Sequence, residues 1–232
     1  MIAGIIAAGE GSRLAAAQPG VPKPLIPVGG RPLACWVVDG LAAAGAVSVT
    51  VLTNSRGGAV APRVAADFPA LAVDAVTADT ASSFESFRLV SLRLAEKAEA
   101  FLISTTDALI PASEVARFWR ECRAMDGELG LALTAHVDDE KPLWADVDAS
   151  GRVSALGAGA RGKDAVTCGL YYMTAAAAKR LPAAGSHRRL RDFLSSQAAA
   201  GRVRGVLLSK TLDVDRPEDL AAAENFLTEK MR

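Results

Sequence analysis

The chain has 232 residues, and its 26 lysines and arginines balance its 26 aspartates and glutamates, so its formal net charge is zero. A chain of this length can bury the core of one α/β domain, and we expect residues 1–232 to form that single domain. Because no net positive charge attracts nucleic acid or an anionic membrane surface, the composition favours a small-molecule partner.

The three cysteines, Cys35, Cys122 and Cys168, show no Cys-x-x-Cys spacing. This pattern argues against a disulfide framework and against a zinc site. No stretch has the apolar length of a membrane span, and the N-terminal residues carry no basic segment followed by a long apolar run. We therefore expect a cytoplasmic protein with reduced thiols.

The first segment, residues 1–6, is short and apolar, contains β-branched side chains and has no helical period. Such a run predicts a strand that is buried on both faces of a parallel sheet. The loop after it holds Gly9 and Gly11, which lack Cβ atoms and can let backbone N–H groups approach a phosphate closely. Arg13 and Lys23 add two positive charges. Together these residues predict a phosphate clamp suited to a triphosphate.

Two familiar nucleotide motifs are excluded in this loop. A dinucleotide fingerprint needs a third glycine where Leu14 stands, and a P-loop needs a Gly-Lys-Ser/Thr sequence that is absent. For the glycine pair taken alone, a tight turn without a ligand is the alternative interpretation.

Further along the chain, apolar runs alternate with helical patterns. The runs lie at residues 2–8, 47–53, 71–76, 99–106 and 129–136, and the helical patterns lie at 32–45, 83–97 and 112–125. This alternation predicts βαβ units and a mainly parallel sheet, with ligands at the carboxyl ends of its strands. Pro32 can occupy the first turn of its helix and Gly45 can end it, while Ser82 and Glu85 form a candidate capping box. Residues 144–156 change to the pattern of a β-hairpin.

Four segments together resemble a known family. Residues 7–14 (AAGEGSRL) and the following Pro22-Lys23-Pro24-Leu25 match an N-terminal signature, and residues 101–107 match an apolar strand that ends in a metal-binding aspartate. Residues 168–173 match a strand with a Gly-(Ile/Leu)-Tyr sequence, and residues 213–220 (DVDRPEDL) match a segment that supplies a second metal carboxylate. In this order, the segments resemble the sugar-phosphate nucleotidyltransferase family.

The resemblance implies a Rossmann-like α/β fold of the glycosyltransferase-A type, with a mixed, mainly parallel central sheet flanked by helices. The hairpin is then the expected acceptor-binding subregion. The implied reaction is the Mg²⁺-dependent transfer of a nucleotidyl group from an NTP to a sugar phosphate or a small alcohol phosphate, with release of pyrophosphate. The motifs lean toward the cytidylyltransferase branch, so CTP or UTP is the favoured donor. A homo-oligomer is left open.

The same resemblance implies a role for each candidate site residue. Arg13 and Lys23 are the expected catalytic residues, and Asp107 and Asp215 are the expected ligands of Mg²⁺. The expected nucleotide contacts are Ala7, Ala8, Gly9, Gly11, Ser12 and Ser83.

Several roles stay open at this level. Asp107 could instead cap a helix, and Asp213 could support or bridge the metal ligands. Arg161 and Lys163 could hold the acceptor phosphate or could belong to an ordinary polar loop.

Two other functions are compatible with the motifs. One is a non-catalytic sensor of a nucleotide or sugar phosphate, which ranks lower because Lys23, Asp107 and Asp215 are all present. The other is an enzyme like molybdopterin guanylyltransferase.

Overall fold

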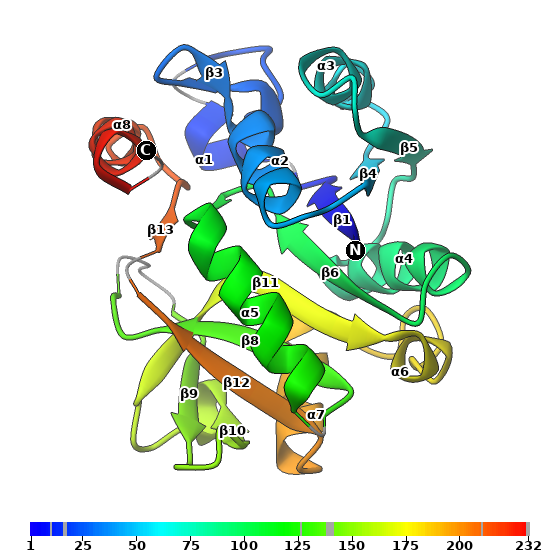
Figure 1. Ribbon diagram of the computed structural model, residues 1–232, viewed down its shortest axis with the longest axis vertical. Coiled ribbons are helices and arrows are strands. Elements are labelled where there is room, and N and C mark those ends of the chain that lie inside the picture. The colour runs from blue at the N-terminus through cyan, green and yellow to red at the C-terminus, as the bar shows by residue number, and fades with distance from the viewer. Residues whose placement is uncertain (10, 16–17, 126, 138–141, 210, 231–232) are drawn as a thin grey trace.

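A nine-stranded mixed sheet runs through the molecule, and helices cover both of its faces (Figure 1). The computed structural model describes residues 1–9, 11–15, 18–125, 127–137, 142–209 and 211–230. This architecture confirms the expected mixed α/β sheet flanked by helices.

The N-terminal half of the sheet is parallel, as the alternation of apolar runs and helices predicts. Its strands lie in the order β6-β1-β4-β5. They are β1 (Ile2–Ala7), β4 (Ser48–Thr53), β5 (Ala72–Thr77) and β6 (Ala100–Thr105). Ile6 of β1 pairs with both Leu52 and Thr105, so the carboxyl ends of three neighbouring strands lie at one edge of the sheet.

The other half of the sheet is mixed. Strand β11 (Ala165–Thr174) is antiparallel to β6 and to β8 (Leu129–Thr134), and β12 (Val203–Leu208) lies parallel beside β8. Strands β9 (Trp144–Val147) and β10 (Val153–Leu156) form the predicted antiparallel hairpin.

Helices pack on the sheet in two groups, each with its own hydrophobic core. On one face lie α2 (Leu33–Ala43), α3 (Val60–Asp67) and α5 (Ala112–Ala124). On the other lie α4 (Ser83–Ala95), α6 (Ala175–Lys179) and α7 (Leu190–Ala199).

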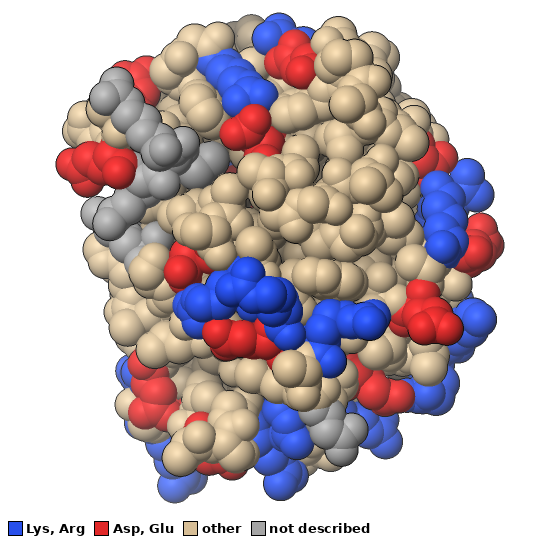
Figure 2. Space-filling view, viewed as in Figure 1, with Lys and Arg blue, Asp and Glu red and all other residues tan. Residues whose placement is uncertain are grey.

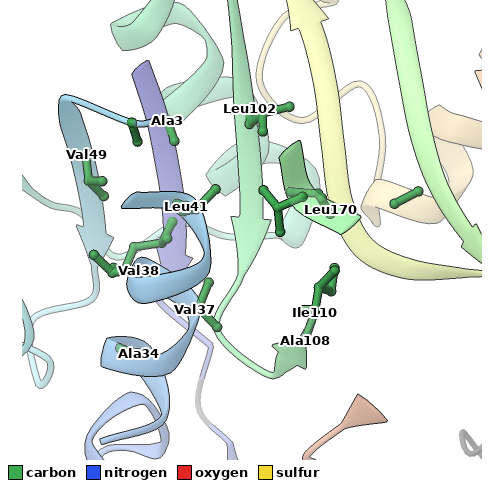
Figure 3. Packing of buried hydrophobic residues seen from close by; sticks show 14 of the residues in the cluster. Ala3, Ala34, Val37, Val38, Leu41, Val49, Leu102, Ala108, Ile110 and Leu170 are labelled. Carbon is green, nitrogen blue, oxygen red and sulfur yellow. The ribbon is translucent and has the colours of Figure 1, made fainter. Parts of the chain in front are cut away.

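Small and branched side chains let α2 pack closely on the sheet. Val38 and Leu41 of this helix belong to one buried cluster with Ala3 of β1 and Leu102 of β6, part of which is drawn in Figure 3. Burying one such valine or leucine side chain contributes about 1.5–3 kcal/mol to folding. This buried cluster joins α2 to β1, the strand that leads into the glycine-containing loop.

Short elements complete the edge where the parallel strands end. They are α1 (Ser12–Ala15), a 3₁₀ turn (Lys23–Leu25), β2 (Pro27–Val28), β3 (Arg31–Pro32), β7 (Ala108–Leu109), β13 (Leu212–Asp213) and α8 (Asp219–Lys230). A second 3₁₀ turn (Gly157–Gly159) follows the hairpin. Because β13 pairs with β7, the C-terminal segment returns to the end of β6 (Figure 1).

The helix ends follow the predicted signals with one difference. Gly45, at φ +98°, follows the last residues of α2, and the Ser82 hydroxyl accepts a hydrogen bond from the Glu85 N–H at the start of α4. Pro32 does not enter the first turn of α2; it precedes Leu33 with an extended ψ of 141°. Pro32 belongs instead to β3, where it is paired with Pro27 of β2.

Basic and acidic side chains are interspersed on the face drawn in Figure 2, as expected for a chain with no net charge. Within the described residues, no helix has both the length and the apolar character needed to cross a membrane.

Candidate active site

A cavity of about 330 Å³ opens at the carboxyl ends of β1 and β6. Its lining includes seven of the ten candidate site residues: Gly9, Gly11, Arg13, Lys23, Ser83, Asp107 and Asp215. Gly9 and Asp215 are 206 positions apart in the sequence, yet the fold brings both to one edge of the sheet. This is the edge at which parallel sheets bind ligands.

Of the other three candidates, Ala7 is the buried last residue of β1. Ala8 precedes the glycines, and its carbonyl oxygen accepts a hydrogen bond from the Asn54 side-chain amide at 3.0 Å. The side chain of Ser12 lies outside the described part of the structure.

Gly11 and Lys23 fit against each other. Gly11 has φ +56°, and a Cβ atom built on it would lie 2.4 Å from Cβ of Lys23. Any side chain at position 11 would therefore collide with the lysine as well as strain the backbone. Glycine at this position lets the loop close directly over Lys23.

Lys23 lies between the two carboxylates at the floor of the cavity. Its residue is only 8 % exposed, and Nζ donates hydrogen bonds to Oδ2 of Asp107 at 2.9 Å and to Oδ1 of Asp215 at 2.5 Å. Arg13 Nη1 lies 3.9 Å from the other oxygen of Asp215. Pro22 and Pro24 flank the lysine and fix its backbone in the short 3₁₀ turn.

These contacts shift the pKa values of Lys23 and Asp107. Burial opposes a charged Lys23, but the carboxylates of Asp107 and Asp215 outweigh it and hold the pKa of the lysine above its ordinary value. Burial likewise opposes ionised Asp107, but the Lys23 ammonium and a hydrogen bond from Thr105 lower the pKa of this carboxyl. Lys23 and Asp107 are therefore both charged near neutral pH.

The backbone fixes the spacing of the two carboxylates. Asp107 directly precedes β7, and Asp215 lies two residues beyond β13, which is paired with β7. The N–H of Val214 also donates to the carbonyl oxygen of Asp107 at 3.0 Å. The two aspartates therefore lie next to the same pair of short antiparallel strands, β7 and β13.

The donor set of this pair suits Mg²⁺. No group of three or more histidine, cysteine, aspartate or glutamate side chains with metal-binding geometry occurs in the part of the chain that the structure describes. A closed protein cage is not required, because Mg²⁺ is commonly bound by one or two carboxylates and completes its shell with waters and substrate phosphates. Asp107 and Asp215 share one cation, Lys23 Nζ, and so lie close enough to serve as such a pair.

Ser83 connects the cavity to α7. Its hydroxyl oxygen accepts a hydrogen bond from the backbone N–H of Leu190, the first residue of that helix, at 2.9 Å. Neighbouring Ser82 acts as the cap of α4, so the two serines have different roles.

Three residues whose roles the sequence leaves open lie outside the cavity lining. Asp213 lines a separate small cavity with His136 and Cys168. The backbone N–H groups of Arg161 and Lys163 both donate to the carboxylate of Asp146 in the hairpin, at 2.8 Å each. This arrangement favours a structural role for the 161–163 loop.

The cavity also contains residues that sequence reasoning did not assign. Thr105 and Thr106 line it, and Asn54 supports the loop through Ala8. The signal for Asn54 was its position directly after a buried strand, at the carboxyl edge of the sheet.

Comparison with known proteins agrees with the geometry. The sequence model of the MobA-like NTP transferase domain matches residues 3–201, a range that includes Lys23, Ser83 and Asp107 but not Asp215. No curated protein matches the sequence.

Solved structures with the same fold cover almost the entire chain. The inositol-1-phosphate CTP transferase from T. maritima is 19 % identical with a TM-score of 0.83, over 99 % of this chain and 97 % of that one. A Bacillus anthracis protein, proposed to be a glucose-1-phosphate thymidylyltransferase and solved with a sucrose, is 17 % identical with a TM-score of 0.83, over 99 % and 96 %. HddC from Yersinia pseudotuberculosis, complexed with GMP-PN, is 19 % identical with a TM-score of 0.75, over 96 % and 97 %.

The family match covers most of the chain and contains the glycine loop and the buried lysine. The chain therefore belongs to the family of MobA-like NTP transferase domains and is a nucleotidyltransferase.

Proposed function

We propose that this enzyme transfers a nucleotidyl group from an NTP to a sugar phosphate or a small alcohol phosphate and releases pyrophosphate. The observation that carries the proposal is the position of Lys23, held between Asp107 and Asp215 beneath the glycine loop. A cation and two carboxylates at one point form the charge arrangement that phosphoryl chemistry requires.

In this proposal the triphosphate lies under the loop of Gly9 and Gly11. Backbone N–H groups of the loop bind its oxygens, and Arg13 and Lys23 supply positive charge on either side. Arg13 is exposed for 55 % of its side chain, so it can turn toward a ligand that enters the cavity.

Asp107 and Asp215 would hold Mg²⁺, the cofactor we propose. When bound, the ion would neutralise phosphate charge during the reaction. With a nucleotide bound, Lys23 would exchange a carboxylate contact for a phosphate oxygen and leave the carboxylate oxygens of Asp107 and Asp215 to hold the ion. A flexible lysine side chain can make this exchange without moving its backbone.

The acceptor phosphate supplies the nucleophile. One of its oxygens forms a bond to the α-phosphorus, the bond from that phosphorus to the bridging oxygen breaks, and pyrophosphate leaves with the bond electrons. Lys23 and Arg13 stabilise the charge on the equatorial and leaving oxygens. The second pKa of a phosphate monoester is about 6, so the acceptor is largely ionised at pH 7 and needs no protein base.

We propose CTP or UTP as the donor; CTP is the nucleotide named for the inositol-1-phosphate CTP transferase whose fold this chain shares. We also propose that residues 1–232 act as one unit, since the cavity takes residues from Ile6 to Asp215.

Pyrophosphate release tests the proposal. The enzyme with Mg²⁺ is incubated with each of CTP, UTP, GTP, ATP and dTTP and a panel of sugar, alditol, inositol and choline phosphates. Acceptor-dependent release with one nucleotide is expected. Tight nucleotide binding with no release across the panel would favour the sensor, and activity confined to GTP with a molybdopterin acceptor would favour the guanylyltransferase.

A further inference from the structure

Residues 213–219 contain four acidic side chains, Asp213, Asp215, Glu218 and Asp219. The structure separates them. Asp215 faces the cavity, Asp213 lines a different one, and Glu218 is exposed. Asp219 is half-buried at the first turn of α8.

Asp219 holds the backbone that carries Asp215. One of its oxygens, Oδ2, accepts hydrogen bonds from the N–H groups of both Asp215 and Arg216, each at 2.8 Å. Its own N–H donates to the carbonyl oxygen of Arg216 at 3.1 Å. A single carboxylate therefore closes the turn between the end of β13 and α8.

The contacts on the two sides of Asp215 come from different elements. On the N-terminal side, Val214 is fully buried and its N–H is bonded to the Asp107 carbonyl oxygen. On the C-terminal side, the turn is held by the two hydrogen bonds to the Asp219 carboxylate and by backbone hydrogen bonds within residues 216–220. Without the Asp219 carboxylate, the N–H groups of Asp215 and Arg216 would lose their acceptor, so the backbone of Asp215 would be less constrained on its C-terminal side and its carboxylate would sample more directions.

We propose that Asp219 is a positioning residue for the metal site: it fixes the backbone of Asp215 so that this carboxylate and that of Asp107 meet one divalent cation. The inference rests on the proposed function, because it takes Asp215 as a metal ligand. Partners that orient metal ligands change metal affinity or activity by about 10–100-fold when they are removed.

The test compares Asp219→Ala with Asp219→Asn. The asparagine side chain keeps an oxygen that can accept the same two N–H bonds, and the alanine side chain does not. Glu218→Ala is the matched control, since it removes one negative charge from the neighbouring, exposed position. Mn²⁺ binding is measured by electron paramagnetic resonance with CTP or UTP present, and the Mg²⁺ concentration for half-maximal pyrophosphate release is measured where a substrate pair is active.

Asp219→Ala is expected to weaken Mn²⁺ binding and to raise the Mg²⁺ requirement by about tenfold or more, with Asp219→Asn and Glu218→Ala within about twofold of the wild type. Equal Mn²⁺ binding by the alanine variant and the control would overturn the positioning role. So would an equal loss in the alanine and asparagine variants, because charge and not hydrogen bonding would then be responsible.

One further variant and two outcomes with the wild-type protein keep the test decisive. If Asp219→Ala unfolds, Asp219→Ser replaces it, since serine retains a capping oxygen but lacks the length to reach both N–H groups. A wild-type protein that binds Mn²⁺ but releases no pyrophosphate would contradict the proposed reaction and leave the Mn²⁺ comparison valid. A wild-type protein that binds no Mn²⁺ would overturn the role of Asp215 as a ligand, and with it this inference.

Discussion

Gly11 lies directly against the side chain of Lys23, so that an added Cβ would approach Cβ of the lysine to 2.4 Å and its Cδ to 2.9 Å. The loop that would bind phosphate and the lysine that would act on it therefore form one packed unit. A change on one side must alter the other.

Gly11→Ala should lower both stability and activity. The positive φ of this residue costs about 1–2 kcal/mol for a side chain with Cβ, and overpacking against Lys23 adds about 1–3 kcal/mol. Urea unfolding measures the free energy. Gly9→Ala is the control for stability, because a Cβ built there has no atom within 4 Å among the described residues other than its own chain neighbours. Equal free energies of unfolding for the two variants would contradict the steric account.

Lys23→Met should reduce transfer by about 100-fold or more, because one donor to developing charge is lost. It should also increase the affinity for Mn²⁺ without nucleotide by roughly tenfold, since Asp107 and Asp215 would face each other without the ammonium between them. Transfer assays and Mn²⁺ titration check the two effects. Lys97→Met is the matched control, as Lys97 pairs with Asp74 away from the cavity. Unchanged Mn²⁺ affinity would show that the lysine does not compete with the metal.

The parallel core of this fold was accessible from sequence because three of its strands, β1, β4 and β6, are mostly buried apolar runs. Strand β6, for example, has five buried residues among six. A continuous apolar run of this kind predicts a strand without any information about the segments that pack beside it. The pairing of β7 with β13 was not accessible. Each strand has only two residues, which is too short to show an alternating hydrophobic pattern. Yet this pair brings Asp107 and Asp215 together.

The choice between Asp213 and Asp215 shows the same limit. Alternation along a strand would place both on one face, but β13 ends at Asp213 and the turn that follows redirects the chain. The two carboxylates consequently line different cavities. Family position favoured Asp215, whereas local pattern alone gave no preference.

Asp107→Asn should raise the Mg²⁺ concentration needed for half-maximal transfer by about tenfold or more, since the amide keeps the shape of the side chain but removes its charge. Steady-state rates across a Mg²⁺ series measure this change. Unaltered activity and metal dependence would assign the carboxylate to structure alone.

Asp74→Asn should make the free energy of unfolding less dependent on pH in the acidic range. Hydrogen bonds from Arg93 and Lys97 hold the pKa of Asp74 below its ordinary value. This stabilisation is present above the unfolded pKa of about 3.9 and is lost as pH falls through the lower folded pKa. The variant should be less stable by about 1 kcal/mol at pH 7, and the difference should vanish in strong acid. Thermal unfolding from pH 7 to pH 2 measures it, with exposed Glu218→Gln as the control; a difference independent of pH would refute the linkage.

Ser82→Ala and Ser83→Ala should separate helix stability from ligand binding. Ser82 caps α4, so its loss should cost about 1 kcal/mol of stability and leave nucleotide affinity unchanged. Ser83 lines the cavity and holds the N–H of Leu190, so its loss should free the start of α7 and weaken nucleotide binding by several-fold. Chemical unfolding and calorimetric titration with CTP and UTP give the two quantities for each variant. If Ser83→Ala binds nucleotide as tightly as Ser82→Ala, the hydroxyl serves only to join α4 to α7, and the nucleotide lies nearer to the glycine loop.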